Sequence, residues 1–204
     1  MHSFKTKIPA TLIFARLVIG FVVVALSLLR VQHYAEWAIV LLAVGLLTDV
    51  FDGIVARRLG ISTQKLRRMD STVDQVFYVS VAAATFIQCP EFFRANAVTL
   101  IVLLSIEALT YVVCFLKFRK EIATHSIGAK VWSLLLFATL VQIILQCDSG
   151  VLFTIFFWMG LITRLEIIAI VLVLRQWTND VPTVYHAVQL RRNKQIKRNK
   201  LFNG

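Results

Sequence analysis

The chain has 204 residues, of which 58% are hydrophobic, and its mean hydropathy is +0.77. This composition excludes a soluble globular domain of ordinary make-up. The net charge of +11 does not indicate a nucleic-acid-binding protein, because the basic residues flank apolar stretches, as in proteins that contact anionic lipid headgroups.

Six apolar stretches follow one another along the chain, at about 12–29, 35–56, 72–88, 98–116, 131–147 and 151–173. Each approaches the roughly 20 residues that a helix needs to cross the core of a bilayer. No long polar segment separates them, so we expect one all-α membrane domain over residues 1–204, built as a bundle of six transmembrane helices.

The segments between and after these stretches also make predictions. Gly60 is expected to stop the second helix, a basic linker should run from Gly60 to Met69, and the third helix should begin at Asp70. The tail from about 175 to 204 contains Trp177, Tyr185 and a basic run, which favours a helix lying at the membrane interface. A disordered basic end is the alternative.

Basic residues alternate sides along the predicted bundle. They precede the first stretch, follow the second and fourth, and crowd the tail, whereas the opposite connections carry only Arg30 and Arg94. By the positive-inside rule both termini and the connection after the second helix are cytoplasmic. The basic residues in the two connections predicted to be cytoplasmic, after the second and fourth stretches, are Arg57, Arg58, Lys65, Arg67, Arg68, Lys117, Arg119, Lys120 and Lys130.

Three cysteines, Cys89, Cys114 and Cys147, show no metal-binding or redox spacing. Cys89 and Cys147 fall near the outer ends of the third and fifth predicted helices, where a bridge is conceivable. Unpaired thiols in apolar surroundings are the favoured interpretation.

Four aspartates carry the strongest chemical signal. Asp49 and Asp52 lie three residues apart at the end of an apolar stretch, and Asp70 and Asp74 lie four apart, so each pair shares one helical face. Carboxylates buried near lipid need a strong cationic partner. Oxygen-only ligands suit Mg²⁺ or Mn²⁺, and we expect the four to converge on one or two such ions.

These residues resemble the signature D-x2-D-G-x2-A-R-x8-G-x3-D-x3-D of the CDP-alcohol phosphatidyltransferase family. Seven of its eight fixed positions are met, by Asp49, Asp52, Gly53, Ala56, Arg57, Asp70 and Asp74. Leu66 stands where the signature has its second glycine. Upstream, Ile8, Pro9 and Arg16 resemble the family's N-terminal stretch, although Ala10 and Ile13 replace its usual Asn and Thr.

The resemblance implies a phospholipid synthase that transfers a phosphatidyl group from CDP-diacylglycerol to the hydroxyl of a small alcohol and releases CMP. It implies that Asp49, Asp52, Asp70 and Asp74 hold the metal and that Asp74 is also the catalytic base. CDP-diacylglycerol binding is assigned to Arg16, Gly53, Arg57 and Thr63. The resemblance also implies a homodimer.

The acceptor is less defined. Inositol, inositol phosphate and glycerol phosphate are candidates, and Asp70-Ser-Thr-Val-Asp74 is more similar to inositol-type members than to the Asp-Pro version of glycerol phosphate enzymes. Lys130 and Arg164 are predicted to bind a phosphorylated acceptor in a cytoplasm-facing polar cavity, although Arg164 is equally suited to pair with Glu107 or Glu166. A metal-dependent lipid diphosphate hydrolase, an inactive relative and a cation transporter are the alternatives.

Overall fold

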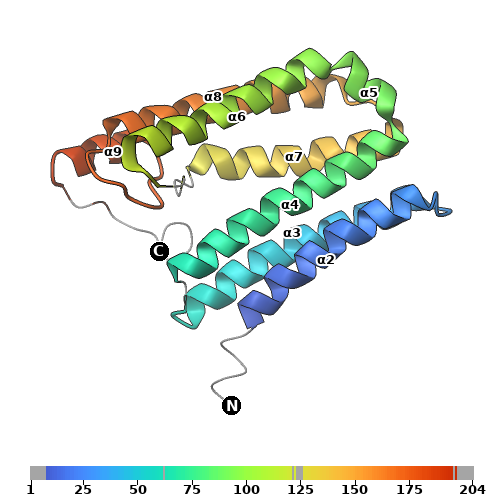
Figure 1. The fold of residues 1–204 in the computed structure, drawn as a ribbon, viewed down its shortest axis with the longest axis horizontal. Helices are drawn as coiled ribbons and strands as arrows, with labels where there is room; N and C mark the ends of the chain where they lie inside the picture. Colours follow the sequence, from blue (N-terminus) through green and yellow to red (C-terminus); the bar gives the residue numbers. More distant parts are fainter. Residues whose placement is uncertain (1–7, 62, 121, 123–125, 195, 197–204) are drawn as a thin grey trace. The chain divides into compact units, whose positions relative to one another are not determined.

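The computed structural model describes residues 8–61, 63–120, 122, 126–194 and 196, and in that part of the chain it contains helices and no strands. Figure 1 shows them in chain order. They are α2 (Ile8–Leu28), α3 (Tyr34–Arg58), α4 (Gln64–Gln88), α5 (Pro90–Ala95), α6 (Ala97–Phe118), α7 (Ile127–Gln146), α8 (Gly150–Val173) and α9 (Val184–Arg191). The all-α prediction is confirmed.

Five of the described helices are long and apolar enough to cross a membrane: α2, α3 up to Ala56, α6, α7 and α8. Large apolar side chains such as Phe14, Phe21 and Leu104 stay exposed on them, as expected of surfaces that face lipid. The predicted third span, 72–88, is helical but lies within α4, which also carries Arg67, Arg68, Asp70 and Asp74. Its membrane crossing therefore stays a prediction.

The start of α4 corrects the predicted linker. The helix begins at Gln64, so residues 64–69 are its first turns and Asp70 lies well inside it. Thr63 is the N-cap, and its side-chain oxygen accepts a hydrogen bond from the Leu66 N–H at 3.2 Å, which satisfies one of the free amides at a helix start. A polar, basic sequence resembles a loop in composition, but with Thr63 as its N-cap it forms the first turns of a helix.

Gly60 ends α3 as predicted. Its φ of +67° lies in the left-handed region, and the Ile61 N–H bonds back to the Ala56 carbonyl at 3.1 Å. This is the hydrogen bond of a Schellman helix end, which needs a residue that tolerates positive φ. The turn brings α4 back toward α3 within five residues of the last turn of α3.

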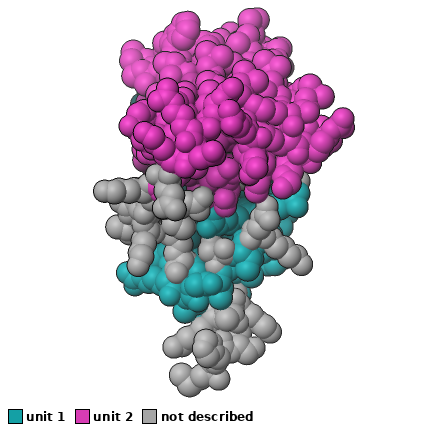
Figure 2. All heavy atoms as spheres, turned by 90° about the vertical axis from the view of Figure 1, so that its left-hand side faces the viewer, with its two compact units in different colours: residues 1–92, 140–148 teal, residues 93–139, 149–204 magenta. Residues whose placement is uncertain are grey.

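The chain divides into two compact units, shown in Figure 2: residues 1–92 with 140–148, and residues 93–139 with 149–204. In unit 1, α2 packs against both α3 and α4. In unit 2, α6 packs against α8, and α8 against α9. The single-domain organisation stays a prediction.

Phe77 of α4 is one of the largest side chains in the core of unit 1 and is almost fully buried. It fits because two facing helices offer glycine: a Cβ on Gly20 of α2 would lie 3.3 Å from the Phe77 Cα, and one on Gly45 of α3 only 2.3 Å from its Cζ. The missing side chains let three helices approach closely around one ring. Gly45 lies one turn before Asp49, and Phe77 about one turn after Asp74, so this packing supports the aspartates.

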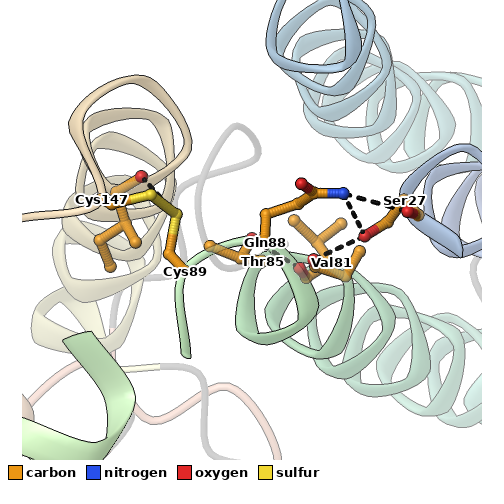
Figure 3. Close-up of a disulfide and its surroundings, with 8 residues drawn as sticks. Ser27, Val81, Thr85, Gln88, Cys89 and Cys147 are labelled. Atoms are coloured by element: carbon orange, nitrogen blue, oxygen red, sulfur yellow. Dashed lines mark hydrogen bonds between the residues drawn. A yellow bond between two sulfur atoms is a disulfide. The ribbon is translucent and has the colours of Figure 1, made fainter. Parts of the chain in front are cut away.

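The end of unit 1 farthest from the aspartates is held by polar contacts and a disulfide (Figure 3). The Ser27 hydroxyl donates to the Ala84 carbonyl at 2.9 Å, and the Gln88 amide donates to the Ser27 carbonyl at 3.0 Å. Cys89, directly after α4, is bonded to Cys147, directly after α7, with Cα atoms 5.2 Å apart. The expectation of unpaired thiols is therefore wrong for these two, while Cys114 is free and buried.

The tail joins unit 2 through apolar packing. Val181 and Ala187 are buried against Ile170 and Leu174 of the α8 end. The helical prediction holds for Val184–Arg191, and a disordered end is excluded there. Most of the basic run beyond Lys194 lies outside the described residues.

Candidate active site

Two helices present the four aspartates to one another. Asp49 and Asp52 come from the last turns of α3, and Asp70 and Asp74 from the second and third turns of α4. One oxygen each from Asp49, Asp70 and Asp74 lies within 4.8 Å of the others. The predicted convergence is thus present for these three, and Asp52 joins them through a shared partner.

That partner is Arg16 of α2, which has a side chain only 1% exposed. Its Nη1 lies 3.1 Å from the Asp49 Oδ1 and 3.1 Å from the Asp70 Oδ1, and it also pairs with Asp74. Its Nη2 pairs with Asp52. One guanidinium therefore contacts all four carboxylates.

The four carboxylates differ in their access to water. The Asp52 side chain is 3% exposed, whereas those of Asp49, Asp70 and Asp74 are 29–39% exposed. Asp52 thus forms the closed floor of the site with Arg16, and the other three line its open side. An incoming polar group reaches the open side first.

The donor set fits a hard divalent cation. Mg²⁺ takes oxygen ligands at about 2.0–2.1 Å, so ligands on opposite sides of one ion lie about 4 Å apart. Three carboxylate oxygens within 4.8 Å of one another are close to that spacing. Among the described side chains of the cluster, every group that offers an electron pair is a carboxylate, which suits Mg²⁺ or Mn²⁺ better than Zn²⁺.

The residues predicted to hold the nucleotide lie next to this cluster in the chain. Gly53 follows Asp52 on α3 and is partly buried. Thr63 caps α4, and its hydroxyl, having accepted from Leu66, can still donate one hydrogen bond. The side chain of Arg57 lies outside the described part of the structure.

Leu66, the departure from the family signature, lies in the first turn of α4 and is partly buried. Its position is helical rather than a sharp loop, so the backbone there does not require glycine. The substitution is compatible with the local conformation, and it changes only the bulk next to the Thr63 cap.

The two residues predicted to bind the acceptor belong to unit 2. Arg164 of α8 pairs with Glu107 of α6, and its guanidinium lies over the ring of Trp132 at 4.5 Å. Of the two roles considered for Arg164, the structure therefore shows the ion pair, and its partner is Glu107 rather than Glu166. Lys130 is exposed in the first turn of α7.

A cavity of about 320 Å³ lies elsewhere in unit 1, lined by Arg30, Val31, Tyr34, Ile87 and Gln88. Arg30 and Val31 lie in the turn between α2 and α3, and the other three belong to the ends of α3 and α4 opposite the aspartates. A cytoplasm-facing cavity at the aspartate cluster therefore stays a prediction.

Sequence reasoning missed the role of Arg16 as the centre of the cluster, and it missed the Gly20–Phe77–Gly45 packing. A charged residue inside an apolar stretch was the available signal for Arg16, since such a residue usually faces a polar interior. The glycines gave no comparable signal.

Comparison with protein-family models matches residues 6–166 to the CDP-alcohol phosphatidyltransferase family. The chain belongs to this family. Comparison with curated proteins and with solved structures gave no significant match. The matched region includes Arg16, all four aspartates, Lys130 and Arg164, and family members are typically dependent on a divalent metal.

Proposed function

We propose that this protein is an integral-membrane phospholipid synthase that transfers a phosphatidyl group from CDP-diacylglycerol to the hydroxyl of a small alcohol. The observation that carries the proposal is the convergence of four carboxylates from α3 and α4 on one cationic position. A family that handles CDP-alcohols needs such a site, because the diphosphate of the substrate is best held and activated by divalent cations.

In this proposal Asp49, Asp52, Asp70 and Asp74 would hold one or two Mg²⁺ or Mn²⁺ ions, which when bound would offset the negative charge of the diphosphate and of the leaving phosphate. Asp74 accepts the proton of the acceptor hydroxyl. The hydroxyl oxygen then forms a bond to the lipid-linked phosphorus, and the bond from that phosphorus to the bridging oxygen breaks. The electron pair leaves with CMP, and the product is a phosphodiester lipid.

The remaining chain residues position the substrates. Gly53 leaves room for the nucleotide beside α3, Thr63 donates a hydrogen bond from the start of α4, and Arg57 binds the diphosphate. Lys130 and Arg164 are proposed to attract a phosphorylated acceptor. For Arg164 the pairing with Glu107 means that acceptor binding must share or replace an existing partner.

We further propose that α4 also crosses the membrane, which brings the number of spans to six, and that the aspartate cluster faces the cytoplasm. The distribution of basic residues supports this orientation. The disulfide supports it independently, because Cys89 follows Asp74 by a helical segment of about 22 Å. Disulfides persist in oxidising compartments, so the opposite end of unit 1 belongs outside.

The deciding experiment measures CMP release from CDP-diacylglycerol by the purified full-length protein, with no acceptor and with inositol, inositol phosphate or glycerol phosphate. We expect release to require one acceptor and to yield the corresponding lipid. Release at the same rate without any acceptor would instead indicate hydrolysis by water. No release under any condition would contradict the proposal.

Matched variants identify the site. Asp74→Asn should abolish transfer while the protein still inserts and unfolds normally. Glu36→Gln removes a carboxylate from the same membrane unit, at the exposed far end of α3, and should leave the rate unchanged. The homodimer implied by the family is tested separately, from the mass of the protein in detergent.

A further inference from the structure

Arg16 is an unusual cation for a site that must bind metal. It is fully enclosed, and its two terminal nitrogens reach all four carboxylates. Three of the four contacts are made by one nitrogen, Nη1. A single positive centre therefore lies where the oxygens of Asp49, Asp70 and Asp74 come together.

Charge balance explains why a cation must be there. Four carboxylates at the end of apolar helices repel one another, and each loses favourable hydration when it is enclosed. One guanidinium offsets a single charge and links α2 to both α3 and α4. It holds the carboxylates close, but it leaves the cluster strongly negative and therefore still attractive to a divalent ion.

The same contacts bring Arg16 into competition with a metal. A divalent ion bound among Asp49, Asp70 and Asp74 competes with Nη1 for the same three carboxylates. Two divalent ions would balance the four carboxylates by themselves. The Arg16 charge would then be uncompensated until another anion arrived.

We propose that Arg16 is a built-in counter-cation that assembles the four carboxylates, is displaced when the metal binds, and then binds the diphosphate of the incoming substrate. This inference rests on the metal site of the proposed function. It makes metal binding and substrate binding cooperative, because the ion releases the guanidinium that the anionic substrate needs.

The test measures Mn²⁺ binding to the full-length protein by the resonance signal of free Mn²⁺, without nucleotide, together with thermal unfolding in chelator. Arg16→Gln should lower the unfolding temperature in chelator, since the carboxylates lose their partner. It should also tighten Mn²⁺ binding by about tenfold or more, the size expected for removing a charge-assisted competitor. If Arg16 only held the fold together, the substitution would lower both the unfolding temperature and the affinity for Mn²⁺.

Two further variants complete the test. Arg16→Lys keeps the charge but cannot contact all four carboxylates, so its Mn²⁺ affinity should lie between those of wild type and Arg16→Gln; this variant decides the question if Arg16→Gln does not fold. Arg30→Gln removes an exposed arginine just beyond the end of α2 and should change neither measurement.

The outcomes separate the two claims. If the wild-type protein binds no Mn²⁺, the metal-dependent function itself is wrong. If the wild type binds Mn²⁺ and both Arg16 variants bind it equally or more weakly, the function stands and the counter-cation inference is overturned.

Discussion

Gly45→Ala tests whether close helix packing supports the aspartate cluster. The added Cβ would lie 2.3 Å from the Cζ of Phe77 and 2.8 and 2.9 Å from its Cε atoms. An ordinary carbon contact needs about 3.5 Å, so the closest approach is short by about 1.2 Å. Gly20 of α2 also lies against Phe77, where a Cβ would be 3.3 Å from its Cδ2, so the ring or the helix backbone has to shift.

The expected cost follows from two opposing terms. Overpacking a close-packed core costs about 1–3 kcal/mol, and replacing glycine by alanine within a helix returns about 0.5–1 kcal/mol. The midpoints of these two ranges leave a net loss of about 1 kcal/mol, which lowers the unfolding temperature by about 2–4 °C in a chain of this length. Because misplacing reacting groups by about 1 Å costs up to about 100-fold, we expect the transfer rate to fall about 10- to 100-fold.

The assay combines thermal unfolding with CMP release, and a second substitution supplies the decisive comparison. Phe77→Leu in the Gly45→Ala background makes room for the methyl group and should restore part of the rate. Gly150→Ala is the control, since its Cβ would meet nothing within 4 Å. A Gly45→Ala variant with wild-type stability and rate, or a double variant slower than Gly45→Ala alone, would refute the reasoning.

Three further outcomes are expected. Excess chelator should abolish transfer, and Mg²⁺ or Mn²⁺ should restore it; full turnover in chelator would exclude the metal site. Cys89→Ser should lower the free energy of unfolding by at most about 4 kcal/mol, the loop-closure value for a bridge across 58 residues. Cys114→Ser, which replaces the free cysteine, is the control. Equal unfolding temperatures for the two variants would mean that the bridge contributes nothing to stability. Leu66→Gly should bind CDP-diacylglycerol as well as the wild type or better, because it removes bulk beside the Thr63 cap, and a severe loss of lipid binding would show that Leu66 forms part of the pocket wall.

The aspartate pairs could be predicted from sequence because their spacing of three and four residues is a local property of a helix. The positions of the long helices followed from apolar runs for the same reason. Arg16 is 33 residues or more from every aspartate in the chain, and only the packing of α2 against α3 and α4 brings it to them. Local patterns carry no information on such contacts.

The remaining errors have a similar origin. Cys89 and Cys147 are separated by 58 residues; the sequence places both at the same side of the predicted bundle, but only the packing of the helices shows that their two ends meet. The charged residues in the first turns of α4 suggest a solvent-exposed linker, yet Lys, Arg and Gln are good helix formers. In the sequence, the signal that distinguishes a capped polar helix from a polar loop here is the N-cap residue Thr63.

The discontinuity of unit 1 has a consequence for biosynthesis. Residues 1–92 leave the ribosome first, but the unit is complete only with residues 140–148, after α6 and most of α7 have been made. The newly inserted α2, α3 and α4 must therefore wait for the last turns of α7, with the Cys89 thiol unpaired meanwhile. Nascent chains arrested before residue 147 is exposed should carry a thiol at Cys89 that a membrane-impermeant reagent labels, and chains released after it should not.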